Sequence, residues 1–133
     1  MLSEFSLFRQ WFIDHWMRAG LVVAGVMLLT LPVYWSNSNR TVMLTTILLP
    51  LYMIHQYEEH AQGKFVAVFN ATIGKGYQVL TEVSAFMINF FGVWVVYLVA
   101  FYLARYVNLG FALIVSYLML VNALTHIASA AVM

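Results

Sequence analysis

The chain contains no cysteine, only two prolines and few charged residues. Without cysteine it can form neither a disulfide nor a thiolate metal site, and it has no cysteine nucleophile. Charged residues make up 8% of the 133 residues, whereas a soluble domain usually carries about 25%. A net charge of +1 offers no basic footprint for a nucleic acid, so we expect no nucleic-acid partner.

Apolar residues dominate what remains of the composition. They make up 64% of the chain, which is more than a core of this size can bury, so lipid is the expected solvent for most side chains. Runs of about 17–25 apolar residues are long enough to cross a bilayer. The sequence therefore predicts an all-α, four-helix transmembrane bundle in a single integral membrane domain, residues 1–133. The expected spans are about 19–35, 41–60, 82–104 and 109–131.

The segments between these spans are more polar. Residues 2–18 mix aromatic side chains with charged ones such as Glu4 and Arg18, which is typical of a helix lying in the membrane interface. Residues 61–81 are predicted to form a loop or a second interfacial segment. Pro50 lies inside the second span, where a missing backbone donor favours a kink.

Alternation of four spans predicts the topology. Both termini and residues 61–81 lie on one side, and the turns at 36–40 and 105–108 lie on the other. Short loops rich in lysine and arginine favour the cytoplasm, which predicts cytoplasmic termini. The first side carries Arg9, Arg18, Lys64 and Lys75, and the second carries Arg40 and Arg105.

A polar motif, HQYEEH, ends the second predicted span. Its residues His55, Glu58 and Glu59 are spaced i, i+3 and i+4 and so share one helical face, whereas His60 points away from that face. Asn122 and His126 are four residues apart in the last span. Counting along the spans puts both groups at a similar depth from the same membrane side, so we predict that they form one site.

The residue types indicate a metal centre. Two histidines and a carboxylate suit a divalent ion, zinc or iron most plausibly, and we assign His55, His126 and Glu59 as ligands. Glu58 would act as general base on a metal-bound water, although the two glutamates could exchange roles. Asn122 or Asn89 would orient a ligand or polarise a substrate carbonyl.

These assignments predict a small membrane metalloenzyme, with hydrolysis favoured. Its substrate would be a lipophilic small molecule, because the cluster opens near the boundary between acyl chains and headgroups. An assembly of several copies is left open. The first alternative is a proton-coupled transporter or binding protein that uses the intramembrane Glu/His cluster, although transport sites usually lie near the midplane. A third is an accessory subunit without chemistry.

The polar residues also have structural explanations. HQYEEH can be the solvated end of a helix, and the Asn122–His126 pair can supply interhelical hydrogen bonds. We interpret His15 and His60 as interfacial. Haem ligation by the two candidate histidine ligands and a metal-free site in which a glutamate activates water remain open. A di-iron centre is disfavoured, since such centres usually draw four carboxylates from a bundle.

In this pairing of H-x-x-E-E with N-x-x-x-H, the chain resembles the HXXEE family of small bacterial membrane proteins over roughly 41–131. The segment Gly63–Phe65 with Asn70 is similar to a degenerate form of the Gly-Phe-rich stretch that follows the motif in that family. Where the family often has Pro-Gly-Gly, this chain has Gln62–Lys64. The resemblance implies a bacterial inner membrane and a shared site, but it implies no particular reaction.

Overall fold

The computed structural model describes residues 4–35 and 39–132, and it is all-α throughout these ranges, as predicted. Three of the four longest helical stretches are about as long as the expected spans, and the first of the four is longer. Their elements are α1 (Glu4–Trp35), α2 (Arg40–His60), α4 (Glu82–Met87), the π-helix η1 (Ile88–Val95), α5 (Val96–Tyr106), the 3₁₀ turn η2 (Leu109–Phe111) and α6 (Ala112–Val132). A short helix, α3 (Phe65–Thr72), follows α2.

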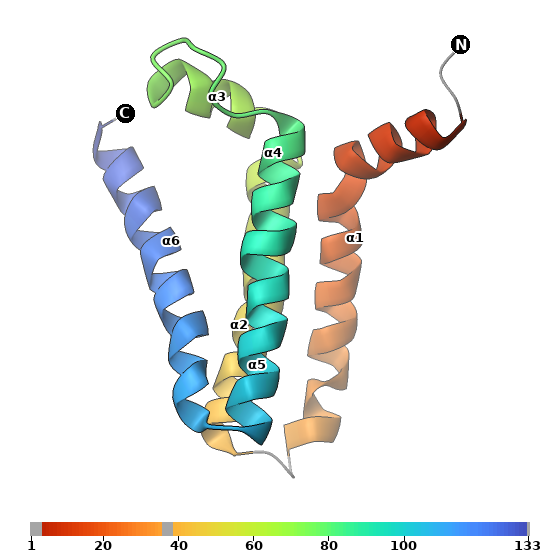
Figure 1. The fold of residues 1–133 in the computed structure, drawn as a ribbon, viewed down its shortest axis with the longest axis vertical. Helices are drawn as coiled ribbons and strands as arrows, with labels where there is room; N and C mark the ends of the chain where they lie inside the picture. Colours follow the sequence, from red (N-terminus) through yellow and green to blue (C-terminus); the bar gives the residue numbers. More distant parts are fainter. Residues whose placement is uncertain (1–3, 36–38, 133) are drawn as a thin grey trace.

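The long helices run antiparallel, one after another (Figure 1). The beginning of α1, the short α3 and the end of α6 lie at one end of the bundle, and η2 lies at the other. This is the alternation that the sequence predicts. The turn expected at 36–40 falls largely on residues 36–38, outside the described part of the chain.

Three of the long helices are long and apolar enough to cross a membrane: Ser6–Trp35, Glu82–Tyr106 and Leu109–Ala128. The expectation of four equally apolar spans is therefore too simple, because α2 is not among them. Its sequence carries three threonines, and its last six residues are the polar motif. These groups lower its mean hydropathy below that of its neighbours.

The polar side chains of α2 are accommodated by burial and by local hydrogen bonds. The helix packs against α1, α5 and α6, and nine of its 21 residues are buried. The hydroxyls of Thr45 and Thr46 donate to the carbonyls of Thr41 and Val42, one turn earlier, at 2.8 Å. A helix covered by protein on several sides can carry polar groups that a lipid-facing helix cannot.

The core lies along this helix. It combines larger side chains from α2 with small residues on its neighbours, and small residues allow helix axes to approach closely. Its fully buried members are Ala24, Leu49, Met53, Tyr97, Ala100 and Val115.

Two connecting segments differ from the sequence prediction. Instead of a separate interfacial helix, the N-terminal residues extend α1 as one continuous helix of 32 residues, whose first turns lean away from the bundle (Figure 1). Residues 61–81 are more ordered than a loop, because they contain α3 and a tight turn that returns to α4. The turn explains part of this order, since the side-chain oxygen of Asn70 accepts from the backbone nitrogens of Val79 and Leu80.

The third long helix is interrupted by the π-helix η1, which the sequence does not predict. Asn89 lies in its first turn, and its amide nitrogen donates to the carbonyl of Ala85 at 2.9 Å. The side chain thereby satisfies a backbone carbonyl near the point where the helical hydrogen bonds change register. π-Helical turns frequently occur at functional sites.

Candidate metal centre

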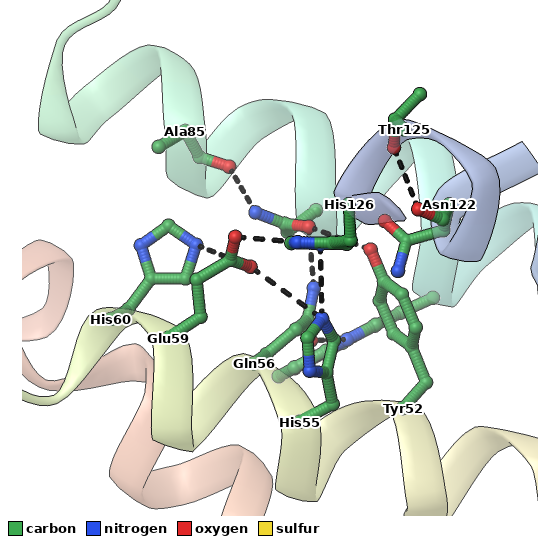
Figure 2. A network of polar contacts seen from close by, with 11 residues as sticks. Tyr52, His55, Gln56, Glu59, His60, Ala85, Asn122, Thr125 and His126 are labelled. Carbon is green, nitrogen blue, oxygen red and sulfur yellow. Dashed lines mark hydrogen bonds and ion pairs between the residues drawn. The ribbon is translucent and has the colours of Figure 1, made fainter. Parts of the chain in front are cut away.

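Three metal-ligating side chains meet where α2 and α6 end (Figure 2). His55 and Glu59 lie one turn apart on α2, so both project from one face, and His126 reaches them from α6. The Nε2 atoms of the two histidines are 3.2 Å apart. One carboxylate oxygen of Glu59 lies 3.5 Å from Nε2 of His126, and the other lies 3.8 Å from Nε2 of His55.

These distances suit a bound divalent ion. Two donor atoms that each lie about 2.0–2.1 Å from a tetrahedral ion are about 3.3 Å from one another. The distance between the two histidine nitrogens is close to that value, and the two Glu59 distances, which involve different carboxylate oxygens, are somewhat longer. With one ligand atom taken from each residue, the atoms all lie within 4.8 Å of one another. His55, Glu59 and His126 could therefore hold a metal with small movements of their side chains, leaving a fourth position for water or substrate.

The carboxylate is the most enclosed member of this group. The Glu59 side chain is 16% exposed, against 38% for His55 and 41% for His126. An enclosed carboxylate needs cationic or hydrogen-bonding partners. Figure 2 shows imidazoles on both sides of the Glu59 carboxylate. In addition to the two ligand-type histidines, Nε2 of His60 lies 3.8 Å from the Glu59 oxygen that faces His55.

The sequence assigned His60 to the interface, but the structure buries it. Only 4% of the residue is exposed. Its ring packs between Trp16 of α1, at a centroid distance of 5.3 Å, and Phe65 of α3, at 4.6 Å. The sequence predicted that His60 points away from the face that carries His55. In the structure α1 lies on that other side of α2, so the His60 ring is covered by protein.

The other predicted site residues occupy different positions. Glu58 is exposed, like Leu51 two turns earlier on the same side of α2, and it is not part of the three-residue group. Asn122 lines the pocket next to His126. His15 lies on α1, where its Nδ1 contacts the Trp11 carbonyl at 2.8 Å, and it does not take part in the group.

A network of hydrogen bonds lies behind the three ligand-type residues. Of its members, only Asn89 was a candidate site residue in the sequence. The side-chain oxygen of Asn89 accepts from the Tyr52 hydroxyl at 3.2 Å and from the amide of Gln56. The oxygen of Gln56 in turn accepts from the indole of Trp94 at 2.7 Å. Gln56 is 1% exposed. Its position inside HQYEEH was a usable signal, since an amide within a span requires a partner.

A pocket of about 500 Å³ is lined by two of the three ligand-type residues, Glu59 and His126. One wall is polar and includes Glu59, Asn89, Asn122 and His126. Most of the remaining lining is apolar, and a large part of it comes from α3. Glu59 and His126 thus face a largely apolar, partly open space.

Comparison with known proteins places the motif in a family. Residues 46–133 match the family model described as "Protein of unknown function with HXXEE motif". The match includes both halves of the site, the HQYEEH motif on α2 and the Asn122–His126 pair on α6. No curated protein and no solved structure matches the chain significantly. The sequence resemblance is confirmed over most of the chain, which belongs to the HXXEE family.

Proposed function

We propose that the chain is an integral membrane protein in which α2 is a fourth crossing, beside the three apolar helices. The support is its antiparallel place in the bundle and its 21 residues, which at the helical rise measure roughly 30 Å. Several of its polar side chains, such as Thr45, Gln56 and His60, are buried against protein. The end of the bundle that carries α3 would then lie at one membrane surface.

We further propose a metal-dependent enzyme that hydrolyses a lipophilic substrate. One observation carries this proposal: ligand atoms of His55, Glu59 and His126 lie within 4.8 Å of one another, and Glu59 and His126 line a largely apolar pocket. Zinc bound by two histidines and a carboxylate lowers the pKa of its water to about 7. An apolar pocket excludes competing water and favours an apolar substrate.

The reaction class that fits is hydrolysis of an ester or amide. Water oxygen bonds to the carbonyl carbon, the bond from that carbon to the leaving oxygen or nitrogen breaks, and the leaving group takes up the proton that water loses. The amides of Asn89 and Asn122 line the pocket and would orient the carbonyl. Glu58 is exposed, lies outside the ligand group and follows His55 by three residues on α2; it is our proposed base.

Metal analysis of the detergent-purified protein tests the centre directly. We expect about one zinc or iron ion per chain in the wild type, and background levels in His126→Ala, which removes a ligand contributed by α6. His15→Ala is the matched control and should keep its metal, because this histidine lies outside the group. A wild type without stoichiometric metal, or a His126→Ala protein with full occupancy, would overturn the proposal.

A transporter is the second candidate, and one observation favours it. The enclosed carboxylate of Glu59 has histidines on both sides, an arrangement that can bind and release protons. In proteoliposomes, this alternative requires Glu59-dependent proton uptake, whereas the enzyme requires none. The position of the group towards one end of the bundle favours the enzyme.

A further inference from the structure

The short helix α3 gives the pocket an apolar wall. Phe65, Val68, Phe69 and Ile73 all line the pocket, and no residue of α3 is buried. Val68 is 46% exposed and Ile73 is 57% exposed. Much of the apolar surface of this helix therefore lacks a protein partner, and part of it faces the same space as the metal-ligating residues.

The turn after α3 fixes this wall in place. The side-chain oxygen of Asn70 accepts from the backbone nitrogens of Val79 and Leu80 at 3.0 and 2.8 Å, and its nitrogen donates to the Leu80 carbonyl at 2.8 Å. Gly74 closes the turn so tightly that a Cβ atom there would lie 2.6 Å from the Asn70 carbonyl. The pocket is thus held open by a specific set of hydrogen bonds rather than by a loose flap.

We propose that this pocket binds one long acyl chain, with the carbonyl end of the chain beside Glu59, His126 and Asn122. The pocket volume of about 500 Å³ is within the range of about 300–1,000 Å³ for small-molecule sites. Apolar lining on one side and a few polar groups on the other match a chain with a single polar end. That the carbonyl end of the ligand reacts rests on the proposed function, whereas binding of the acyl chain in the pocket does not.

Two lysines indicate what lies beyond the carbonyl. Lys64 immediately precedes α3, and Lys75 lies in the turn that follows it; both are exposed. Basic side chains at a membrane surface attract phosphate and carboxylate groups. A fatty acid and a phospholipid share the acyl chain and an anionic end, so both are sources of the ligand, and the experiment uses one probe for each.

Photo-crosslinking tests the site without requiring metal or turnover. The purified protein is illuminated with a diazirine-tailed fatty acid and, separately, with a phosphatidylethanolamine that carries the same chain. We expect saturable labelling of residues 65–73 and 85–89 by at least one probe, competed by its unlabelled counterpart. Val68→Trp, which fills the pocket, should lower this labelling at least tenfold. Val22→Trp, an exposed position of α1, should not change it.

The controls separate this inference from the proposed function. His55→Ala should lose metal yet keep the saturable labelling, since His55 does not line the pocket. Failure of metal binding with intact labelling would reject the enzyme and leave the acyl site standing. Labelling spread evenly over the lipid-facing helices, or unchanged in a Val68→Trp protein that keeps wild-type helicity and metal content, would overturn the acyl site.

Discussion

Glu58 and Glu59 are neighbours in the chain but differ in their surroundings. Successive residues of an α-helix are about 100° apart around the axis, so the two carboxylates leave α2 in different directions. Glu59 points towards His126 and is largely enclosed, whereas Glu58 is exposed. The structure therefore favours Glu59 as the ligand, and Glu58 remains the carboxylate available as base.

This difference predicts two distinct phenotypes. Glu59→Gln should lose the metal, because a neutral amide replaces the anionic donor. Glu58→Gln should keep the metal and lose about 10²–10⁴-fold in turnover, which is the usual contribution of a general base. Metal content and hydrolysis of an acyl ester measure the two effects. Unchanged activity in Glu58→Gln with normal metal content would remove Glu58 from the mechanism.

The sequence was informative about the site where spacing alone decides geometry. The i, i+4 separation of His55 and Glu59 and the similar depth of His126 predicted the group that the structure brings together. Spacing could not show which of the two glutamates faces His126 on α6, because Glu58 and Glu59 leave α2 on opposite sides of His55. That choice depends on the packing of neighbours such as Gln56, whose burial follows from the whole bundle.

Among the elements, the π-helix shows most clearly how backbone geometry supports the network. It contains Asn89, near its start, and Trp94, near its end, and both are joined to Gln56 by hydrogen bonds. An extra residue in a helical turn changes the direction of every side chain after it. The π-helix therefore allows two side chains on one helix to reach the same buried amide.

Inserting one alanine between Gly92 and Val93 should break this network. The insertion places the Trp94 indole one residue further from Asn89 and rotates it by about 100°, away from Gln56. We expect a lower midpoint of thermal unfolding and reduced metal binding in detergent. Gly92→Ala is the matched control, since an added Cβ at this position meets nothing within 4 Å. Equal midpoints for the insertion and the control would show that the spacing set by the π-helix does not support the network.

The sequence predicted the long helices better than it predicted these local features. Apolar runs in the sequence indicate α1, the third long helix and α6, because a helix that crosses lipid must be apolar over the thickness of the bilayer. The eight residues of α3 are too short to form a stable helix on their own. Their conformation depends on contacts such as that between Phe65 and His60 and on the turn held by Asn70, neither of which has a local signature.

At the scale of the whole molecule, the charges divide between the two ends of the bundle. The end with α3 carries four basic residues and the other carries two, so we propose that the former faces the cytoplasm. The candidate metal centre and the pocket lie towards this same end, since most of their residues come from the last turns of α2, from α3 and from the second half of α6. A substrate would then reach the site from the cytoplasmic leaflet.

Cysteine labelling tests this orientation, and the natural chain contains no cysteine to interfere. Gln62→Cys and Val107→Cys introduce single thiols at exposed positions at opposite ends of the bundle. In right-side-out bacterial spheroplasts, we expect an impermeant maleimide to label only Val107→Cys, and both after permeabilisation. Labelling of both positions in intact spheroplasts would contradict the four crossings, and labelling of Gln62→Cys alone would reverse the orientation.

The polar character of α2 also bears on the biogenesis of the protein. A translocon releases a segment sideways into lipid according to its apolar content, and the threonines, Gln56 and Glu59 make α2 a poor candidate on its own. Its most extensive packing partner is α1, which precedes it directly in the chain. The two helices are therefore suited to insert together as a hairpin, in which the apolar surface of α1 compensates for the polar groups of α2. The insertion signal for the helix that carries the HXXEE motif would then lie largely in the helix before it.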